Sequence, residues 1–210
     1  GGTLPPFEAG AHIEVYLPGD LVRQYSLAGD PAQTSSYELA VLREPQSRGG
    51  SAFMCDKVKV GDQLQISMPR NHFHLNRQGT KHLLVAGGIG ITPIRAMAQE
   101  LRHANADYFV VYCARSPDQT AFRDEFETLV AAGTAQLHYD GGDPAAAIDF
   151  SALLDAHTDC TDLYFCGPLG FMRSLRAEAE KRSGLNLHFE YFAADQAAVE
   201  AAKAAAGGFV

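Results

Sequence analysis

The sequence predicts a two-domain fold, in which an antiparallel β-domain, built as a barrel or a sandwich, precedes a parallel α/β domain. Residues 1 to about 78 hold short strand patterns at regular spacing, separated by Gly, Pro, Asp and Ser. From about residue 81, strand and helix patterns alternate, as they do in parallel βαβ units. The chain has 210 residues, enough for two small domains. We place the boundary between them in the segment HLNRQGTK, residues 74–81.

The first domain, predicted over residues 1–78, is expected to contain four strands and one short helix. The strands are placed at 12–17, 23–28, 36–44 and 62–69, where apolar and polar residues partly alternate. A short helical pattern covers residues 50–58.

The second domain, predicted over residues 79–193, is expected to contain five strands and three helices. The strands are placed at 81–87, 107–114, 135–140, 162–167 and 186–192. The helices are placed at 93–104 with Pro93 as its first residue, at 120–132 closed by Gly133, and at 168–182. The Ala-rich residues 194–210 are interpreted as a linker rather than a helix.

Composition excludes several classes of function. The net charge of −8 and the pI of about 5.4 argue against a nucleic-acid surface or a polybasic membrane patch. No apolar run approaches the roughly 18 residues of a membrane span. The four cysteines are widely spaced and the eight histidines form no ligand motif, so neither a zinc site nor an iron–sulfur cluster is expected. Sparse cysteine use predicts a reducing cytoplasm, and the unusual ends suggest a fragment of a longer polypeptide.

A glycine-rich turn in residues 83–97, LLVAGGIGITPIRAM, is the first candidate site. An apolar strand leads into Gly87, Gly88 and Gly90, and Thr92 and Pro93 open a helix. Glycines let backbone N–H groups approach a phosphate, and a helix N-terminus favours an anion. The spacing is not the G-x-G-x-x-G of the usual dinucleotide fingerprint. A tight connection that binds no ligand is the alternative.

Residues 163–175, LYFCGPLGFMRSL, form a second strand-to-helix turn, at Cys166, Gly167 and Pro168. In an open parallel sheet, ligands bind outside the carboxyl ends of the strands. The two turns could therefore line one crevice. Taken alone, Cys166 is better explained as a small buried apolar residue.

Two segments of the first domain complete the candidate site. In RQYSL, Arg23 and Tyr25 share one face of a strand and Ser26 faces the other way. In SRGGSAFM, Arg48 and two glycines precede Ser51 and a short helical pattern, which could cradle an anion. An ordinary edge strand and a hairpin turn are the alternatives.

Taken in order, RQYSL, RGGS, GGIGITP and CGP resemble the ferredoxin–NADP reductase superfamily. More narrowly, they resemble the reductases of Rieske oxygenases of the phthalate dioxygenase reductase and vanillate demethylase reductase type. LPPFEAGAHIEV, GDQLQISMPRNHFHL, TAFRDE and HFEYF extend the likeness over nearly the whole chain. The resemblance implies a Greek-key flavin-binding barrel followed by a nucleotide-binding domain.

The resemblance also implies roles in binding FMN. Arg23 would meet the flavin phosphate, Tyr25 would pack on the isoalloxazine and Ser26 would hydrogen-bond near N5. The remaining flavin contacts would be Ala40, Val41 and Leu42 along the ring, and Arg48, Gly49, Gly50 and Ser51 around the phosphate. FAD is the alternative flavin.

For NADH, the resemblance implies that Gly87, Gly88, Gly90, Thr92 and Pro93 hold the dinucleotide. Cys166, Gly167 and Pro168 would flank the nicotinamide, and Glu190 and Phe192 would border the flavin. Ser26, Thr92 and Cys166 would lie at the reacting atoms. Arg115 could accept the 2′-phosphate of NADPH, whereas Asp118 favours a free ribose hydroxyl, so the residues leave that choice open and the family favours NADH.

The resemblance implies a hydride transfer from NADH to FMN, then single electrons to a [2Fe-2S] centre that supplies an oxygenase. Family members carry two further strands before LPPFEAG and a ferredoxin domain after the segment matching GGFV. The iron–sulfur carrier would therefore lie outside this chain, with a terminal oxygenase beyond it. A reductase for a different acceptor, such as a haemoprotein, and a non-catalytic redox-sensing module are the alternatives.

Overall fold

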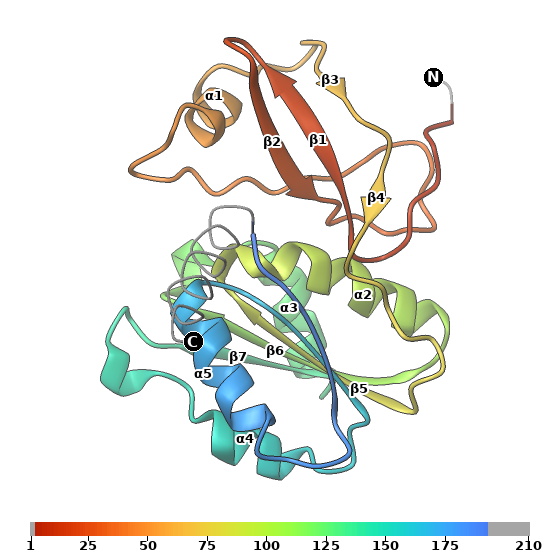
Figure 1. The fold of residues 1–210 in the computed structure, drawn as a ribbon, viewed down its shortest axis with the longest axis vertical. Helices are drawn as coiled ribbons and strands as arrows, with labels where there is room; N and C mark the ends of the chain where they lie inside the picture. Colours follow the sequence, from red (N-terminus) through yellow and green to blue (C-terminus); the bar gives the residue numbers. More distant parts are fainter. Residues whose placement is uncertain (1–2, 193–210) are drawn as a thin grey trace, which may run out of the picture. The chain divides into compact units, whose positions relative to one another are not determined.

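The computed structural model describes residues 3–192, which form two compact units (Figure 1). The first unit runs to Gln78 and includes Ile91–Asp107. The second comprises Gly79–Gly90 and the chain from Tyr108 onward. The linker expected at 194–210 lies outside the described residues.

The first unit contains an antiparallel sheet, as predicted. Its strands are β1 (Ala11–Leu17), β2 (Leu21–Ser26), β3 (Gln65–Ile66) and β4 (Arg70–Asn71), and β1 pairs with each of the others. Along β1, Ile13 and Val15 face a core that also holds Phe7 and Leu27, whereas Glu14 and Tyr16 face outward. The period-2 pattern of the sequence is thus a pattern of burial.

One of the predicted strands is wrong, and another is shorter than predicted. Residues 36–44 form no strand, and 62–69 is reduced to β3, with β4 starting after it. The 36–44 segment is held by isolated contacts, such as Ala28 N–H to the Glu38 carbonyl at 2.9 Å and a bidentate Arg43–Asp56 ion pair. Its alternation describes half-buried side chains, but no ladder of backbone hydrogen bonds accompanies it.

The short helical pattern is confirmed as α1 (Gly50–Asp56). Helix α2 (Ile91–His103) is longer and is grouped with the first unit. Arg95 Nη1 donates to Glu38 Oε2 at 2.6 Å, and Glu100 Oε2 accepts from the Ala9 N–H at 3.2 Å. By chain order, however, α2 is the crossover between two strands of the parallel sheet. The domain boundaries read from the sequence stay a prediction.

The second unit is built on a five-stranded sheet of the predicted parallel kind. Its strands are β5 (Lys81–Gly87), β6 (Asp107–Ala114), β7 (Ala135–Tyr139), β8 (Asp162–Cys166) and β9 (Asn186–Glu190). Their order is β7-β6-β5-β8-β9. The chain fills one half of the sheet from β5 outward and then returns to place β8 beside β5. The β5–β8 junction is therefore the topological switch point, where such sheets bind ligands.

Among its described residues, this unit has three α-helices: α3 (Arg123–Ala131), α4 (Phe150–Ala156) and α5 (Leu169–Ala179). Short 3-10 turns occupy Gly88–Gly90 (η1), Pro117–Gln119 (η2) and Pro144–Ala146 (η3). The sequence missed α4 and overextended α3 and α5. Helix α2 begins at Ile91, two residues before Pro93. Because Phe122 adopts a left-handed conformation (φ 57°) as the N-cap, α3 starts later than predicted.

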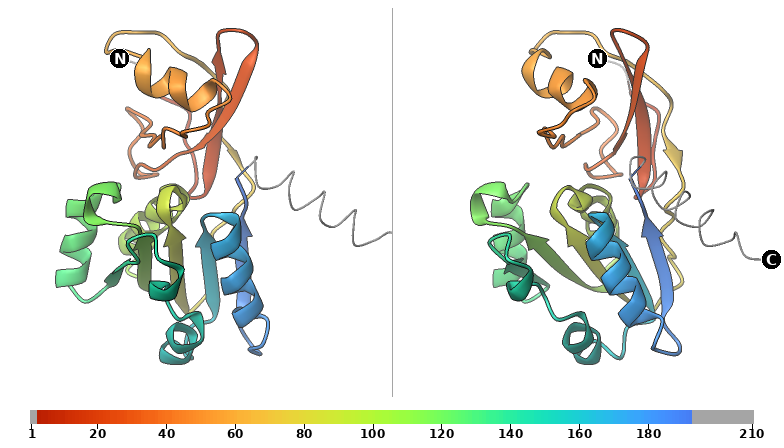
Figure 2. Two further views of the ribbon diagram at one scale, coloured as in Figure 1. Left: turned by 90° about the vertical axis from the view of Figure 1, so that its left-hand side faces the viewer. Right: turned by 60° about the vertical axis from the view of Figure 1, so that its left-hand side comes forward.

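Side chains from both faces of the second sheet are buried. Phe150, Leu153 and Leu154 of α4 and Met172 and Leu175 of α5 pack on one face, against Val85, Val111 and Phe165. Figure 2 shows α5 lying along the strands. On the other face, Tyr112 packs edge-on against Phe126 of α3, with ring centroids 5.2 Å apart.

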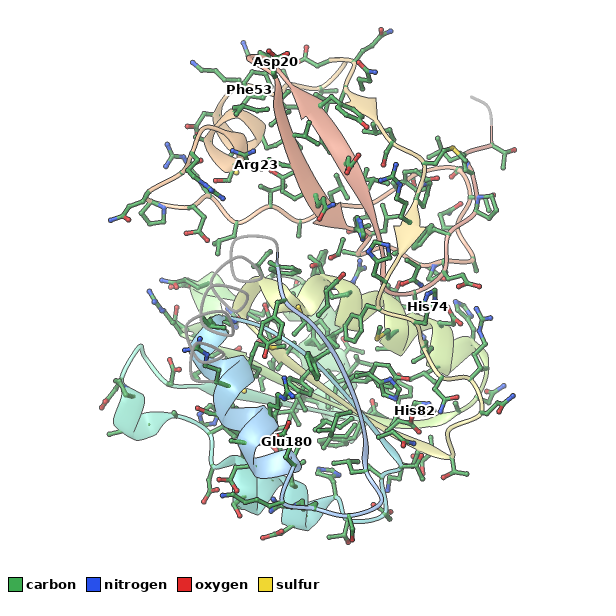
Figure 3. The ribbon with its side chains drawn as sticks, in the orientation of Figure 1. Asp20, Arg23, Phe53, His74, His82 and Glu180 are labelled. Carbon is green, nitrogen blue, oxygen red and sulfur yellow. The ribbon has the colours of Figure 1, made fainter. Side chains whose placement is uncertain are left out.

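The amino end of this sheet is tied by a buried carboxylate. Asp162 is fully buried and accepts from Thr161 Oγ1 at 2.8 Å, and His188 Nε2 lies 2.8 Å from its other oxygen. His188 also stacks on Tyr164, with centroids 4.3 Å apart. His82, labelled in Figure 3, is buried in the same region. This network joins the amino ends of β8 and β9, away from the carboxyl ends where the candidate site lies. No helix among residues 3–192 is long and apolar enough to cross a membrane.

Candidate functional site

In the second unit, the two predicted glycine turns meet at the switch point. Strands β5 and β8 pair in register, with Ala86 opposite Cys166. A Cβ on Gly90 would run into the backbone of Cys166 and lie 2.7 Å from the Gly167 nitrogen. A Cβ on Gly167 would lie 3.1 Å from the Gly87 Cα. The turns touch backbone to backbone, and only glycine permits that approach.

Gly88 has a different role from its neighbours. Its φ is +53°, and a Cβ there would meet nothing within 4 Å. The turn is therefore open at Gly88, and α2 follows it directly in the chain. Thr92 and Pro93 are buried in the first turn of α2. An open glycine turn before a long helix fits a phosphate group.

After β8, Cys166 and Gly167 are buried and Pro168 is exposed as the N-cap of α5. Phe171 lies against both turns: its ring would be 3.2 Å from a Cβ at Gly87 and 2.8 Å from one at Gly167. Sequence reasoning missed Phe171. An aromatic residue one turn into the helix after Gly-Pro is the signal that could have identified it.

Glu190 ends β9 and pairs in register with Cys166. Its Oε2 is buried and accepts no hydrogen bond from the described residues. Burial raises the pKa of this carboxyl to about 7. Phe192, half-buried, follows two residues later. A buried carboxyl group that titrates near neutrality is typical of functional sites.

The residues considered for cofactor choice lie beyond the ends of β6 and β7. Arg115 is exposed after β6, and its Cδ would be 3.9 Å from a Cβ at Gly142, in the loop after β7. Asp118 is exposed in η2. Both the cation that could contact the 2′-phosphate of NADPH and the carboxylate that favours the ribose hydroxyl of NADH are therefore exposed. The choice between the two nucleotides stays open.

In the first unit, Arg23 of β2 lies against the start of α1 (Figure 3). A Cβ on Gly50 would lie 2.6 Å from Arg23 Cγ. The guanidinium donates to the carbonyl of Arg48 at 2.9 Å and to that of Val22 at 2.8 Å. Arg23 thus fixes the loop that precedes α1, and its predicted phosphate contact stays a prediction.

The turn before α1 is shaped by small residues. Gly49 has φ +91°, and a Cβ there would lie 3.0 Å from Leu21 Cδ1. Ser51 Oγ donates to Ser47 Oγ at 3.0 Å, and Ser47 Oγ accepts from the Ala52 N–H at 3.2 Å. Ser47 was missed as a site residue, although a serine before a helical pattern is a capping signal. The Arg48 side chain is exposed beside this turn.

The remaining flavin candidates are placed less regularly. Tyr25 is half-buried opposite Ile13, and burial raises the pKa of its hydroxyl. Ser26 is buried opposite His12. Ala40 and Val41 are half-buried and Leu42 is exposed, on a segment without strand pairing. A separate cavity of about 370 Å³, lined by Pro6, Phe7, Glu8, Ala11, Pro69 and Asn71, touches none of the predicted site residues.

Comparison with known proteins assigns these turns to a family. Residues 65–186 match the dimethylamine monooxygenase subunit DmmA-like family, N-terminal domain. The chain belongs to this family. The DmmA-like match covers the second sheet from before β5 to the start of β9, including both glycine turns.

The DmmA-like chain is also similar to reductases of oxygenase systems. It is 46% identical over 196 residues to a vanillate O-demethylase oxidoreductase of Pseudomonas sp., covering 92% of this chain and 62% of that protein. It is 38% identical over 195 residues to phthalate dioxygenase reductase of Burkholderia cepacia, covering 92% and 61%. The chain thus spans about three-fifths of the length of these relatives.

Solved structures are also similar to this chain. Phthalate dioxygenase reductase superimposes with a TM-score of 0.84 and 38% identity, over 91% of this chain and 60% of that one. An intact type IV self-sufficient cytochrome P450 monooxygenase gives a TM-score of 0.83 and 36% identity, over 92% and 25%. The predicted fold class and the resemblance to oxygenase reductases of the ferredoxin–NADP reductase superfamily are confirmed.

Proposed function

We propose that the chain is the flavin- and nucleotide-binding part of an NADH-dependent oxygenase reductase. It accepts a hydride from NADH onto FMN, and single electrons pass on to a [2Fe-2S] centre in a ferredoxin domain or partner protein. From there they reach a terminal oxygenase. A reducing cytoplasm is the proposed compartment.

The pair of glycine turns at the β5–β8 switch point carries this proposal. Gly90 and Gly167 bring two strand-to-helix turns into backbone contact, while Gly88 leaves one of them open. This arrangement suits a pyrophosphate at the start of α2 and a nicotinamide beside Cys166. The similarity to reductases at 38–46% identity supports the same reading.

When bound, FMN supplies the chemistry of taking two electrons together and releasing them singly. The chain would supply binding and orientation. Arg23 and Arg48 bring positive charge to the turn at Gly49 and Gly50, where the phosphate would lie. Tyr25 offers a ring face, and Ser26 a hydroxyl, at the end of β2.

In the second unit, Gly87, Gly88 and Gly90 would hold NADH. Cys166 and Gly167 would border the nicotinamide. No acid or base is needed for the hydride step, so these residues would act by binding and orienting the nicotinamide. The buried carboxyl of Glu190 would make this end of the sheet sensitive to protonation near pH 7.

A different electron acceptor is the second candidate. The similar P450 monooxygenase is described as self-sufficient, so a related fold occurs in a haemoprotein chain. That observation favours a haem acceptor as the alternative to an oxygenase fed by a [2Fe-2S] centre.

The test is an anaerobic titration of the purified chain, supplemented with FMN, followed in the visible spectrum. We expect FMN to bind and NADH to bleach its absorbance, with NADPH slower. Bound flavin that neither nucleotide reduces would contradict the proposal and favour a redox-sensing module. Adding the matching ferredoxin or a haemoprotein to the reduced chain then distinguishes the two acceptors.

A further inference from the structure

His12 is a buried histidine for which the proposed function has no role. It lies on the outward face of β1 with only 5% of its surface exposed. Its Nε2 is buried and makes no hydrogen bond within the described part of the chain. Buried polar atoms without a hydrogen-bond partner are uncommon in folded proteins, so this nitrogen calls for a functional explanation.

Two residues lie directly opposite His12 in the sheet, Arg70 on β4 and Ser26 on β2. His12 and Ser26 are directly opposite in the β1–β2 register. The Leu27 N–H donates to the Ala11 carbonyl at 2.8 Å, which makes His12–Ser26 a non-hydrogen-bonded pair. Side chains approach most closely in such pairs, with Cβ atoms about 4.5–5.5 Å apart. The two side chains share one face, and one water could bridge the Ser26 hydroxyl and His12 Nε2.

His12 also contacts an exposed residue, His72. The ring of His72, just after β4, lies edge-on at 5.3 Å between centroids, and His72 is exposed. Charged groups also face His12: Glu14 from β1 and Arg70 from β4. Burial, His72 and Arg70 lower the pKa of His12, and Glu14 raises it less. The imidazole is therefore neutral at pH 7 and able to accept a proton.

We propose that His12 is a positioning residue that accepts a proton through the Ser26 hydroxyl and passes it to solvent beside His72. This inference rests on the proposed function, which puts Ser26 at the flavin N5 edge. A hydride from NADH delivers two electrons and one proton to the flavin. The two electrons leave singly for the iron–sulfur or haem acceptor.

The proton balance then requires one proton to reach water for each hydride accepted. Ser26 would take the proton from the flavin while giving its own, through one water, to His12 Nε2. The resulting imidazolium would lose one proton to water, which restores a neutral imidazole and the Ser26 hydroxyl. No further oxidant or base is needed.

The test is His12→Gln, which keeps a side chain able to hydrogen-bond but unable to take up the proton. The full chain is loaded with FMN, reduced anaerobically with NADH and reoxidised with ferricyanide, a one-electron oxidant. We expect the rate of flavin reduction to be unchanged and the rate of reoxidation to fall at least tenfold. General acid–base catalysis usually contributes about 100-fold or more, so tenfold is a cautious lower bound. The wild-type reoxidation should show a solvent deuterium isotope effect that the variant lacks.

The matched control is His74→Gln. His74 is an exposed histidine of the same unit, 3.8 Å from Glu8. It should reoxidise at the wild-type rate. A second readout is the ¹⁵N spectrum of the imidazole rings. Adding FMN should shift the His12 nitrogens in the wild type but not in Ser26→Ala.

Three results would overturn the inference. The first is His12→Gln reoxidising normally with the isotope effect intact. The second is an equal slowing of reduction and reoxidation with weaker FMN binding, which would mean a structural role. The third is a ¹⁵N signal of His12 that does not shift when FMN is added. If NADH fails to reduce the wild type, the proposed function fails instead, and reduction by dithionite still allows the reoxidation test.

Discussion

The two units shape their candidate anion sites in different ways. In the second unit the glycine turns are fixed by backbone lying against backbone, at Gly90 and Cys166. In the first unit the turn before α1 is fixed by side chains, chiefly Arg23 donating to the Arg48 carbonyl and Ser47 bonding to Ser51. A backbone contact leaves no room for an added atom, whereas a side-chain contact can be weakened in steps. We therefore expect a single added methyl group to have a large effect in the second unit. In the first unit, the effect should depend on how much of the side chain is removed.

Gly90→Ala should have the largest effect. The added methyl group would overlap the backbone of Cys166, so β5 and β8 would have to separate at their carboxyl ends. The φ of Gly90 is not positive, so the effect is steric alone. We expect a loss of about 3 kcal/mol in unfolding free energy, at the upper end for overpacking. NADH-dependent flavin reduction should fall about 100-fold, because misplacement by about 1 Å costs that much.

The matched control for this variant is Gly170→Ala. Gly170 lies in α5, has no positive φ, and a Cβ there meets nothing within 4 Å. Urea unfolding should show this variant to be more stable by roughly 0.5–1 kcal/mol, since alanine favours a helix. If Gly90→Ala were as harmless as Gly170→Ala, the two turns would not be in contact.

Arg23→Ala should have the next largest effect, on binding rather than on stability. Removing the guanidinium takes away a positive charge and the two hydrogen bonds that hold the loop at Arg48. Hydrogen bonds to charged groups contribute about 1.5–3 kcal/mol each. We expect FMN affinity, measured by fluorescence titration, to fall about 10- to 100-fold. Arg23→Lys should recover part of this loss, because lysine keeps the positive charge but lacks the paired N–H donors of the guanidinium.

Arg43→Ala is the comparison for Arg23. Arg43 makes a bidentate ion pair with Asp56 near the same helix, but both side chains are exposed. Exposed pairs contribute roughly 0–1 kcal/mol. FMN affinity should hardly change. Equal losses in Arg23→Ala and Arg43→Ala would mean that general electrostatics, and not the ordered turn, governs binding.

The same contrast explains what the sequence could predict. The sequence predicted the two strand-to-helix turns of the second unit, at Gly87, Gly88 and Gly90 and at Cys166-Gly167-Pro168. Few residues other than glycine fit such closely packed backbone positions. The parallel sheet followed from strong apolar runs. In the first unit, alternation over 36–44 predicted a strand, but burial of one face does not guarantee a pairing partner, and none of its described contacts forms a ladder.

Side-chain roles were harder to predict. Ser47 and Phe171 act through contacts between elements, and the orphaned nitrogen of His12 depends on what covers it in the folded chain. Sequence spacing does not contain that information. The register that puts His12 opposite Ser26 comes from long-range strand pairing.

The smallest predicted effect belongs to Glu190 and depends on pH. Its folded-state pKa of about 7 lies above the ordinary carboxyl value of 4.5. The folded protein therefore holds this proton more tightly than the unfolded chain does. Stability contributed by the neutral form is complete below pH 4.5 and falls as the pH rises to about 7. We expect a loss of about 2 kcal/mol over this window, less than the full value of ~3 because Glu190 keeps some solvent contact.

Glu190→Gln removes this titration, since the amide stays neutral. Urea unfolding of both proteins from pH 4.5 to 7.5 gives the difference in unfolding free energy, from which all other titrating groups cancel. The difference should grow in favour of Gln as the pH rises. Glu180→Gln, at the C-cap of α5 and paired with Arg176 at 2.6 Å, is the control for replacing an exposed carboxylate of the same unit. A flat difference for Glu190→Gln would mean that its carboxylate is solvated in the folded protein. The edge of the second unit beside Cys166 would then be wetter than its backbone packing implies.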